Sequence, residues 1–200
     1  MENIEINDLP NLNPEILLKP SPEEILVRNH ILDSTILSFG IEKNQKIIHF
    51  GFGSRNSSFL HHIKDKYMDY TGVDANDNVV SHYKNEPFFL NHTFVNSTIQ
   101  NYIDQNKETR KIYDWCIIDG LIDKNQYEDH QYDYIDTLIR ESLYISEIGV
   151  ILVIDGNYTI DDDSYNPEFI TAFVGSMYNR FTTCRLNEHQ YLVCIYKHYL

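Results

Sequence analysis

An apolar strand that runs directly into two glycines most constrains the fold of this chain. It spans residues 46–54 (KIIHFGFGS), and a second apolar stretch, residues 70–74 (YTGVD), ends in Asp74, 21 residues after Gly53. A strand, a glycine-rich turn, a helix and a second strand ending in a carboxylate are typical of a nucleotide-binding doubly wound sheet. Glycine lets the turn approach a ligand closely, and the carboxylate can accept hydrogen bonds from both ribose hydroxyls. The pattern predicts a cofactor that carries an adenosine.

The turn itself matches neither of two common phosphate-binding sequences. A dinucleotide fingerprint has a third glycine three residues after the second, and Asn56 occupies that position. A phosphate cradle of the G-x-x-x-x-G-K-[ST] type needs a lysine at the start of the helix, and residues 51–58 contain none. These differences count against a dinucleotide or a nucleoside triphosphate as the ligand.

Strands and helices are predicted to alternate along most of the chain. The apolar patterns predict five parallel strands, at 47–50, 70–73, 93–95, 115–118 and 150–154, with helices near 56–66, 78–85 and 132–144. A helix that begins at Pro167 precedes a predicted hairpin of residues 181–186 and 191–196. The sequence therefore predicts an α/β fold in which a mostly parallel sheet is covered by helices on both faces.

The first 40 residues are predicted to form a helical extension to this domain. The sequence SPEE at residues 21–24 is a capping box with proline at the first helical position, and the apolar pattern that follows runs to Gly40. We expect residues 1–41 to form this extension and residues 42–200 to form the sheet domain.

Composition limits the partners. The 200 residues carry a formal charge of −14, which repels a nucleic-acid backbone and disfavours a DNA or RNA substrate. The start of the chain lacks the features of a signal peptide, and no apolar run is long enough to span a membrane, so we expect a soluble cytoplasmic protein. The three cysteines lack C-x-x-C spacing and are expected to be buried thiols. The oligomeric state stays open.

In its glycine spacing and strand count, the chain resembles the class I S-adenosylmethionine-dependent methyltransferases. Their first motif is an acidic residue followed by x-G-x-G-x-G, which Gly51 and Gly53 match, while His49 takes the acidic position and Arg55 the third glycine. The family has seven strands, the last inserted antiparallel, and the resemblance covers roughly residues 42–200. It also implies that the N-terminal extension, residues 1–41, covers the cofactor or forms the acceptor pocket. The hairpin favours this family over nucleotide dehydrogenases, whose sheets usually continue with a sixth parallel strand.

The resemblance implies a set of cofactor-binding residues. Asp74 matches the acid that holds the ribose hydroxyls, although an aspartate there could also cap a helix or stabilise a loop. Ala75 lines the same turn, and Asn96 and Ser97 lie where the family places groups against the adenine edge. Ser97 is also a natural N-cap for the next helix. The glycine turn, with Phe52 between its two glycines, completes the predicted site.

The same resemblance implies a catalytic carboxylate and raises the question of a metal. Asp119 ends the fourth strand in YDWCIIDG (residues 113–120), which is similar to small-molecule O-methyltransferases, and it is the best single catalytic candidate. In that group the same carboxylate can bind a metal with a second aspartate, matched here by Asp155. Asp119 and Asp155 are therefore tentative ligands for Mg²⁺, although Asp155 could equally cap a turn.

The expected reaction is direct displacement of a methyl group from S-adenosylmethionine to a small-molecule acceptor, at oxygen, with no covalent enzyme intermediate. The sequence contains neither a Pro-Cys motif for cytosine C5 chemistry nor an Asp/Asn-Pro-Pro-aromatic motif for base amines. Two alternatives remain open. A non-catalytic methyltransferase-like module would explain His49, Arg55, Ile122 and Gly156, where the chain departs from the family pattern. An aminopropyltransferase-like enzyme would suit the negative charge.

Overall fold

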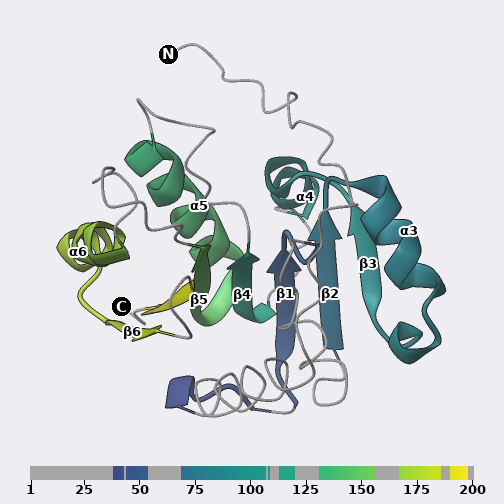
Figure 1. The fold of residues 1–200 in the computed structure, drawn as a ribbon, viewed down its shortest axis with the longest axis horizontal. Helices are drawn as coiled ribbons and strands as arrows, with labels where there is room; N and C mark the ends of the chain where they lie inside the picture. Colours follow the sequence, from purple (N-terminus) through teal and green to yellow (C-terminus); the bar gives the residue numbers. More distant parts are fainter. Residues whose placement is uncertain are drawn as a thin grey trace.

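A seven-stranded sheet with helices on both faces organises the part of the chain that the structure describes (Figure 1). The structure is a computed structural model, and it describes residues 38–42, 44–53, 69–106, 108, 113–119, 131–155, 167–185 and 190–197. The predicted helices at 21–40 and 56–66 lie almost wholly outside these residues. Of the first, residues 38 and 39 are helical, and Gly40 has a φ of 79° at the predicted helix stop.

The strand order confirms the predicted sheet. From one edge to the other it is β3-β2-β1-β4-β5-β7-β6, with β3 at the right of Figure 1 and β6 at the left. Strands β1 to β5 are parallel, and β7 lies antiparallel between β5 and β6. The bounds are β1 Lys46–Phe50, β2 Asp69–Asp74, β3 Thr93–Asn96, β4 Tyr113–Asp119, β5 Ser146–Asp155, β6 Phe181–Arg185 and β7 Gln190–Tyr196.

The helices divide between the two faces of the sheet. Helix α3 (Asp77–Asn85) and the short 3₁₀ helix η2 (Pro87–Phe89) pack on one side, which we call the α3 face. Helices α4 (Ile99–Asn106), α5 (Gln131–Ile145) and α6 (Pro167–Met177) pack on the other, the α5 face. No helix in these described stretches is long and apolar enough to cross a membrane.

Burial on both faces explains the near-continuous apolar composition of the central strands. In β1, Ile47 packs into the core of the α3 face, whereas Ile48 and Phe50 pack into the core of the α5 face. Side chains of a strand alternate between the faces, so His49 falls on the α3 face with Ile47. His49 is fully buried there, an unusual place for an imidazole.

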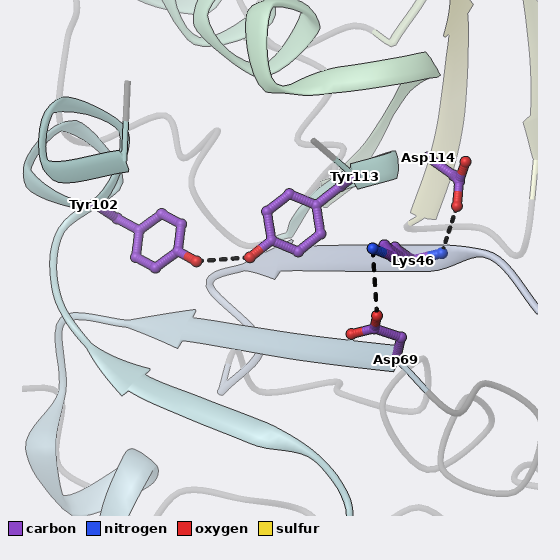
Figure 2. A network of polar contacts seen from close by, with 5 residues as sticks. All are labelled: Lys46, Asp69, Tyr102, Tyr113 and Asp114. Atoms are coloured by element: carbon purple, nitrogen blue, oxygen red, sulfur yellow. Dashed lines mark hydrogen bonds and ion pairs between the residues drawn. The ribbon is translucent and has the colours of Figure 1, made fainter. Parts of the chain in front are cut away.

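Polar contacts tie the starts of the central strands together, at the edge opposite the glycine turn (Figure 2). The Lys46 N–H at the start of β1 donates to Asp114 Oδ2 over 2.6 Å, and Lys46 Nζ lies 4.0 Å from Asp69 Oδ2 of β2. The second contact is exposed, so it contributes little stability. On the α5 face, the hydroxyls of Tyr102 and Tyr113 lie 2.7 Å apart and join α4 to β4. Burial, then this hydrogen bond, raises the pKa of Tyr102.

Candidate functional site

The turn after β1 is fixed by its backbone and by one buried ring. Gly51 has a φ of 72°, which favours glycine, and its N–H donates to the carbonyl of Val73 over 2.9 Å. The Phe52 side chain is fully buried, with its ring centroid 5.1 Å from that of Phe94. A Cβ on Gly72 would lie 2.8 Å from the Phe52 ring, so Gly72 makes room for it. The buried Phe52 side chain therefore anchors the turn. The backbone of residues 51–53 is left to face a ligand.

Asp74 bridges the glycine turn and the start of α3. Its Oδ2 accepts a hydrogen bond from the Gly53 N–H over 3.1 Å, and its Oδ1 accepts one from the Asn76 N–H over 2.8 Å. Burial raises the pKa of Asp74, although both N–H donors act to lower it. A carboxylate offers about four lone-pair positions, and these bonds use two of them. Two hydroxyl groups of a ligand could donate to the remaining positions of the Asp74 carboxylate. They would replace hydrogen bonds from water that the carboxylate loses on burial.

The end of β3 supports the same turn. Asn96 Nδ2 donates to the carbonyls of Asp74 over 3.2 Å and Ala75 over 3.0 Å, and the Ser97 N–H donates to the Asp74 carbonyl over 3.0 Å. The structure thus brings the predicted residues Asp74, Ala75, Asn96 and Ser97 together at one edge. The Ser97 N–H and the Asn96 side-chain amide are both engaged in holding this turn.

The N-caps of the neighbouring helices α3 and α4 test the cap roles that the sequence allows for Ser97 and Asp74. Thr98 Oγ1 accepts from the Asn101 N–H over 3.2 Å at the start of α4, so Thr98 is the cap and the alternative reading of Ser97 as the N-cap is wrong. Asn76 Oδ1 accepts from the Asn78 N–H over 3.0 Å and caps α3. Asp74 does not cap that helix, which leaves its carboxylate directed at the glycine turn.

Asp119, at the end of β4, lies beside two buried polar side chains that sequence reasoning did not assign to the site. His49 Nε2 of β1 is 3.6 Å from Asp119 Oδ2, and His49 Nδ1 is 2.9 Å from the Tyr70 hydroxyl of β2. All three residues are at most 2% exposed. Burial, followed by the charge of Asp119, raises the pKa of Tyr70 well above its ordinary value. Asp119 Oδ1 has no hydrogen-bond partner among the residues that the structure describes.

The signal for this cluster was present in the sequence as strand alternation. His49, Tyr70 and Asp119 occupy positions on three neighbouring strands that face the same side of the sheet. From the sequence alone, His49 is a departure from an acidic motif position. The strand order was needed to place it between the other two.

The second predicted metal ligand, Asp155, lies on the neighbouring strand β5, and its side chain is outside what the structure describes. In the β4–β5 register Asp119 lies beside Val153, two residues before Asp155, so both strands end at the same edge of the sheet. Over the described ranges, no three His, Cys, Asp or Glu side chains gather closely enough to hold a metal ion. The tentative Mg²⁺ site therefore gains no support here.

Comparisons with known proteins identify the fold. No family model and no curated protein sequence matches the chain. Among solved structures, it resembles magnesium protoporphyrin IX methyltransferase from Synechocystis with bound S-adenosylmethionine, with a TM-score of 0.56 and 15% identity. That match covers 86% of this chain and 81% of the other.

Two further solved structures give the same result. A S-adenosylmethionine-dependent methyltransferase from Archaeoglobus fulgidus matches with a TM-score of 0.56 and 12% identity, over 84% of this chain and 94% of the other. The plantazolicin methyltransferase BpumL in complex with a monoazolic desmethylPZN analog and S-adenosylhomocysteine matches with a TM-score of 0.56 and 11% identity, over 86% of this chain and 82% of the other. At these identities the likeness shows that the chain shares the fold of these proteins, and it leaves the activity to be argued from the site.

Proposed function

We propose that this protein is an S-adenosylmethionine-dependent methyltransferase that methylates a small-molecule acceptor at oxygen. The observation that carries the proposal is the Asp74 carboxylate. It is held against the Gly53 N–H at the end of β2, with lone-pair positions left for two ribose hydroxyls. The fold, which solved S-adenosylmethionine-dependent methyltransferases share, supports the same cofactor.

The residues present fit such a cofactor. A Cβ on Gly53 would overlap Val79 of α3 and would lie 3.0 Å from Asp74 Oδ2, so glycine lets the turn lie close to the carboxylate. In the proposed complex Asp74 holds the ribose, Asn96 faces the adenine edge, and the backbone of residues 51–53 lies against the amino-acid end. When bound, S-adenosylmethionine supplies an already activated methyl group, so the protein needs no covalent nucleophile.

Asp119 is the proposed catalytic residue. It ends β4 at the edge of the sheet where ligands of open α/β folds bind, beside the turn after β1. Its Oδ1 is buried and lacks a described partner, so it is suited to accept a hydrogen bond and then the proton of an acceptor hydroxyl. The protein would thereby orient the acceptor oxygen and remove its proton.

Calorimetric titration with S-adenosylmethionine and S-adenosylhomocysteine tests the proposal, with NAD as a control ligand and with and without Mg²⁺. We expect micromolar binding of both S-adenosyl ligands and none of NAD. A preference for NAD, or no binding of either S-adenosyl ligand, would contradict the proposal. A requirement for Mg²⁺ would bring Asp119 and Asp155 back as ligands.

Replacing Asp74 by Ala is the sharpest single test of the site. Loss of two charge-assisted hydrogen bonds should weaken S-adenosylhomocysteine binding by about 1–3 kcal/mol, roughly 5- to 150-fold. Asp69→Ala is the matched control, because Asp69 begins the same strand, at the end away from the glycine turn, and its side-chain contact among the described residues is an exposed one with Lys46. Equal affinities for the two variants would remove Asp74 from the site.

The second candidate function is a cofactor-binding module without turnover. The observation in its favour is the burial of Asp119, which is only 2% exposed and lies against His49. An enzyme releases S-adenosylhomocysteine when it is given S-adenosylmethionine and a panel of hydroxyl acceptors. A module binds both ligands and releases no product.

A further inference from the structure

We infer that His49 and Tyr70 are positioning residues for Asp119, and that the three side chains form a buried polar chain that leaves Asp119 Oδ1 for the acceptor. The inference rests on the proposed function for the role of Asp119. It goes beyond that function because it assigns a role to His49, which occupies the acidic position of the first motif.

The geometry of the chain follows from the strand order. Tyr70 comes from β2, His49 from β1 and Asp119 from β4, which are consecutive strands in the sheet. The Tyr70 hydroxyl is 2.9 Å from His49 Nδ1, and the two rings meet edge-on at 85°. On the other side of the imidazole, Nε2 lies 3.6 Å from Asp119 Oδ2. The imidazole therefore stands between a phenol and a carboxylate, away from water.

One arrangement of protons fits the three groups. Tyr70 keeps its hydroxyl proton because burial and the charge of Asp119 both oppose its loss, and this is the effect that raises the pKa of Tyr70. The hydroxyl can then donate to His49 Nδ1, which leaves the ring proton on Nε2, facing the carboxylate. In this arrangement the Nε2 proton faces Oδ2 across 3.6 Å, an electrostatic contact longer than a hydrogen bond, and Oδ1 is left for a ligand.

The burial of Asp119 makes such a partner necessary. A carboxylate out of contact with water is costly unless hydrogen bonds or an opposite charge compensate it. An acidic side chain at position 49 would instead place a second negative charge beside the first, and two like charges repel more strongly in a buried site than in water. The imidazole at 49 and the carboxylate at 119 are thus complementary.

The proposed step moves one proton. The O–H bond of the acceptor breaks, its electron pair stays on the acceptor oxygen, and the proton passes to Asp119 Oδ1. His49 and Tyr70 keep their own protons and hold the carboxylate in place. Since they act through Asp119, their loss should disturb its orientation and should not remove the cofactor site around Asp74.

Nitrogen NMR of the full-length protein, with ¹⁵N-labelled histidine and saturating S-adenosylhomocysteine, tests the chain. The His49 signals are assigned by their loss in His49→Gln. We expect the wild type to show the Nε2-protonated tautomer. Tyr70→Phe should shift the Nδ1 resonance, whereas Asp119→Ala should shift the Nε2 resonance. Tyr102→Phe is the control, because it removes a buried hydroxyl from the α5 face and should shift neither nitrogen.

The outcomes separate the inference from the proposed function. An Nδ1-protonated His49, or a Tyr70→Phe variant that moves neither nitrogen, overturns the positioning chain even if the cofactor binds. Failure of the wild type to bind S-adenosylhomocysteine defeats the proposed function, while the same spectra without ligand still test the chain. Tyr70→Phe removes a single oxygen and keeps the ring packed, so it should fold. It therefore keeps the test decisive even if another variant misfolds.

Discussion

Gly53 and Val79 show at the scale of single residues how closely α3 packs against the glycine turn. A Cβ added to Gly53 would lie far inside van der Waals contact with Val79 Cγ1. Gly53→Ala should therefore lower the free energy of unfolding by about 1–3 kcal/mol, the usual cost of overpacking. It should also weaken cofactor binding, because the clash lies beside Asp74. Denaturant unfolding and calorimetric titration measure the two effects.

Val79→Ala provides the companion variant for this prediction. Removing the two methyl groups of Val79 creates the space that a Cβ at position 53 would need, so the double variant should be more stable than the sum of the single changes predicts. Strict additivity would mean that the glycine is required for some other reason, such as its backbone conformation.

The residues of the site differ in how far the sequence reveals them. Gly51, Gly53 and Asp74 are recognisable because a turn and a strand end have local signatures, and the structure brings them together as predicted. His49 and Tyr70 have no such signature. Their meeting depends on the side-by-side placement of β2, β1 and β4, which residue spacing along the chain does not encode.

At the scale of elements, the β5–β7 pair depends on a glycine. A Cβ on Gly149 of β5 would clash with the backbone carbonyl oxygen of Ile195 and would lie 2.9 Å from the Trp115 ring. Backbone cannot yield as a side chain can, so Gly149→Ala should separate β7 locally and cost about 1–3 kcal/mol or more. Hydrogen exchange of the β7 amides should accelerate.

Gly175 of α6 is the matched control for this change. A Cβ there would approach only the far end of the Phe181 ring, at 2.9 Å, and alanine favours a helix over glycine by up to about 1 kcal/mol. Phe181 lies on β6 and pairs with Ile195 of β7, so Gly175→Ala should accelerate exchange in β7 less than Gly149→Ala does. Equal protection of β7 in both variants would contradict the importance of Gly149.

The elements themselves were largely predictable. Buried runs such as 150–154 identify central strands, and the structure confirms five parallel strands followed by the antiparallel hairpin. Boundaries shifted by a few residues, as at β5, which begins at Ser146, because hydrogen bonding continues past the apolar run. The role of Gly149 was not foreseen, since it depends on contact with a strand about 46 residues away.

At the scale of the whole molecule, the accessibility of the cysteines measures the unfolding of both hydrophobic cores. Cys116 lies in the core of the α5 face and Cys194 in that of the α3 face, and Cys184 of β6 is partly exposed. Burial raises the pKa of both core thiols to about 12, so at pH 8 they stay protonated and unreactive. Iodoacetamide at pH 8 should label Cys184 first, and the other two together as the protein unfolds.

Mass spectrometry over a denaturant series checks this prediction. The two core cysteines should become labelled at the same denaturant concentration, because both faces share one sheet and should unfold in a single transition. Labelling of Cys194 well before Cys116 would show that the end of the sheet formed by β6 and β7 opens separately.

The interior position of β7 also affects how the protein is made. β7 is the last of the seven strands along the chain, yet it lies between β5 and β6. Until it emerges from the ribosome, the apolar edge of β5 has no partner on that side, and about 35 further residues must follow, a delay on the order of seconds. During that interval the nascent chain exposes the unpaired backbone groups of β5, which can pair with another chain. The amount of folded protein in the cell should therefore depend on chaperones that shield such strand edges.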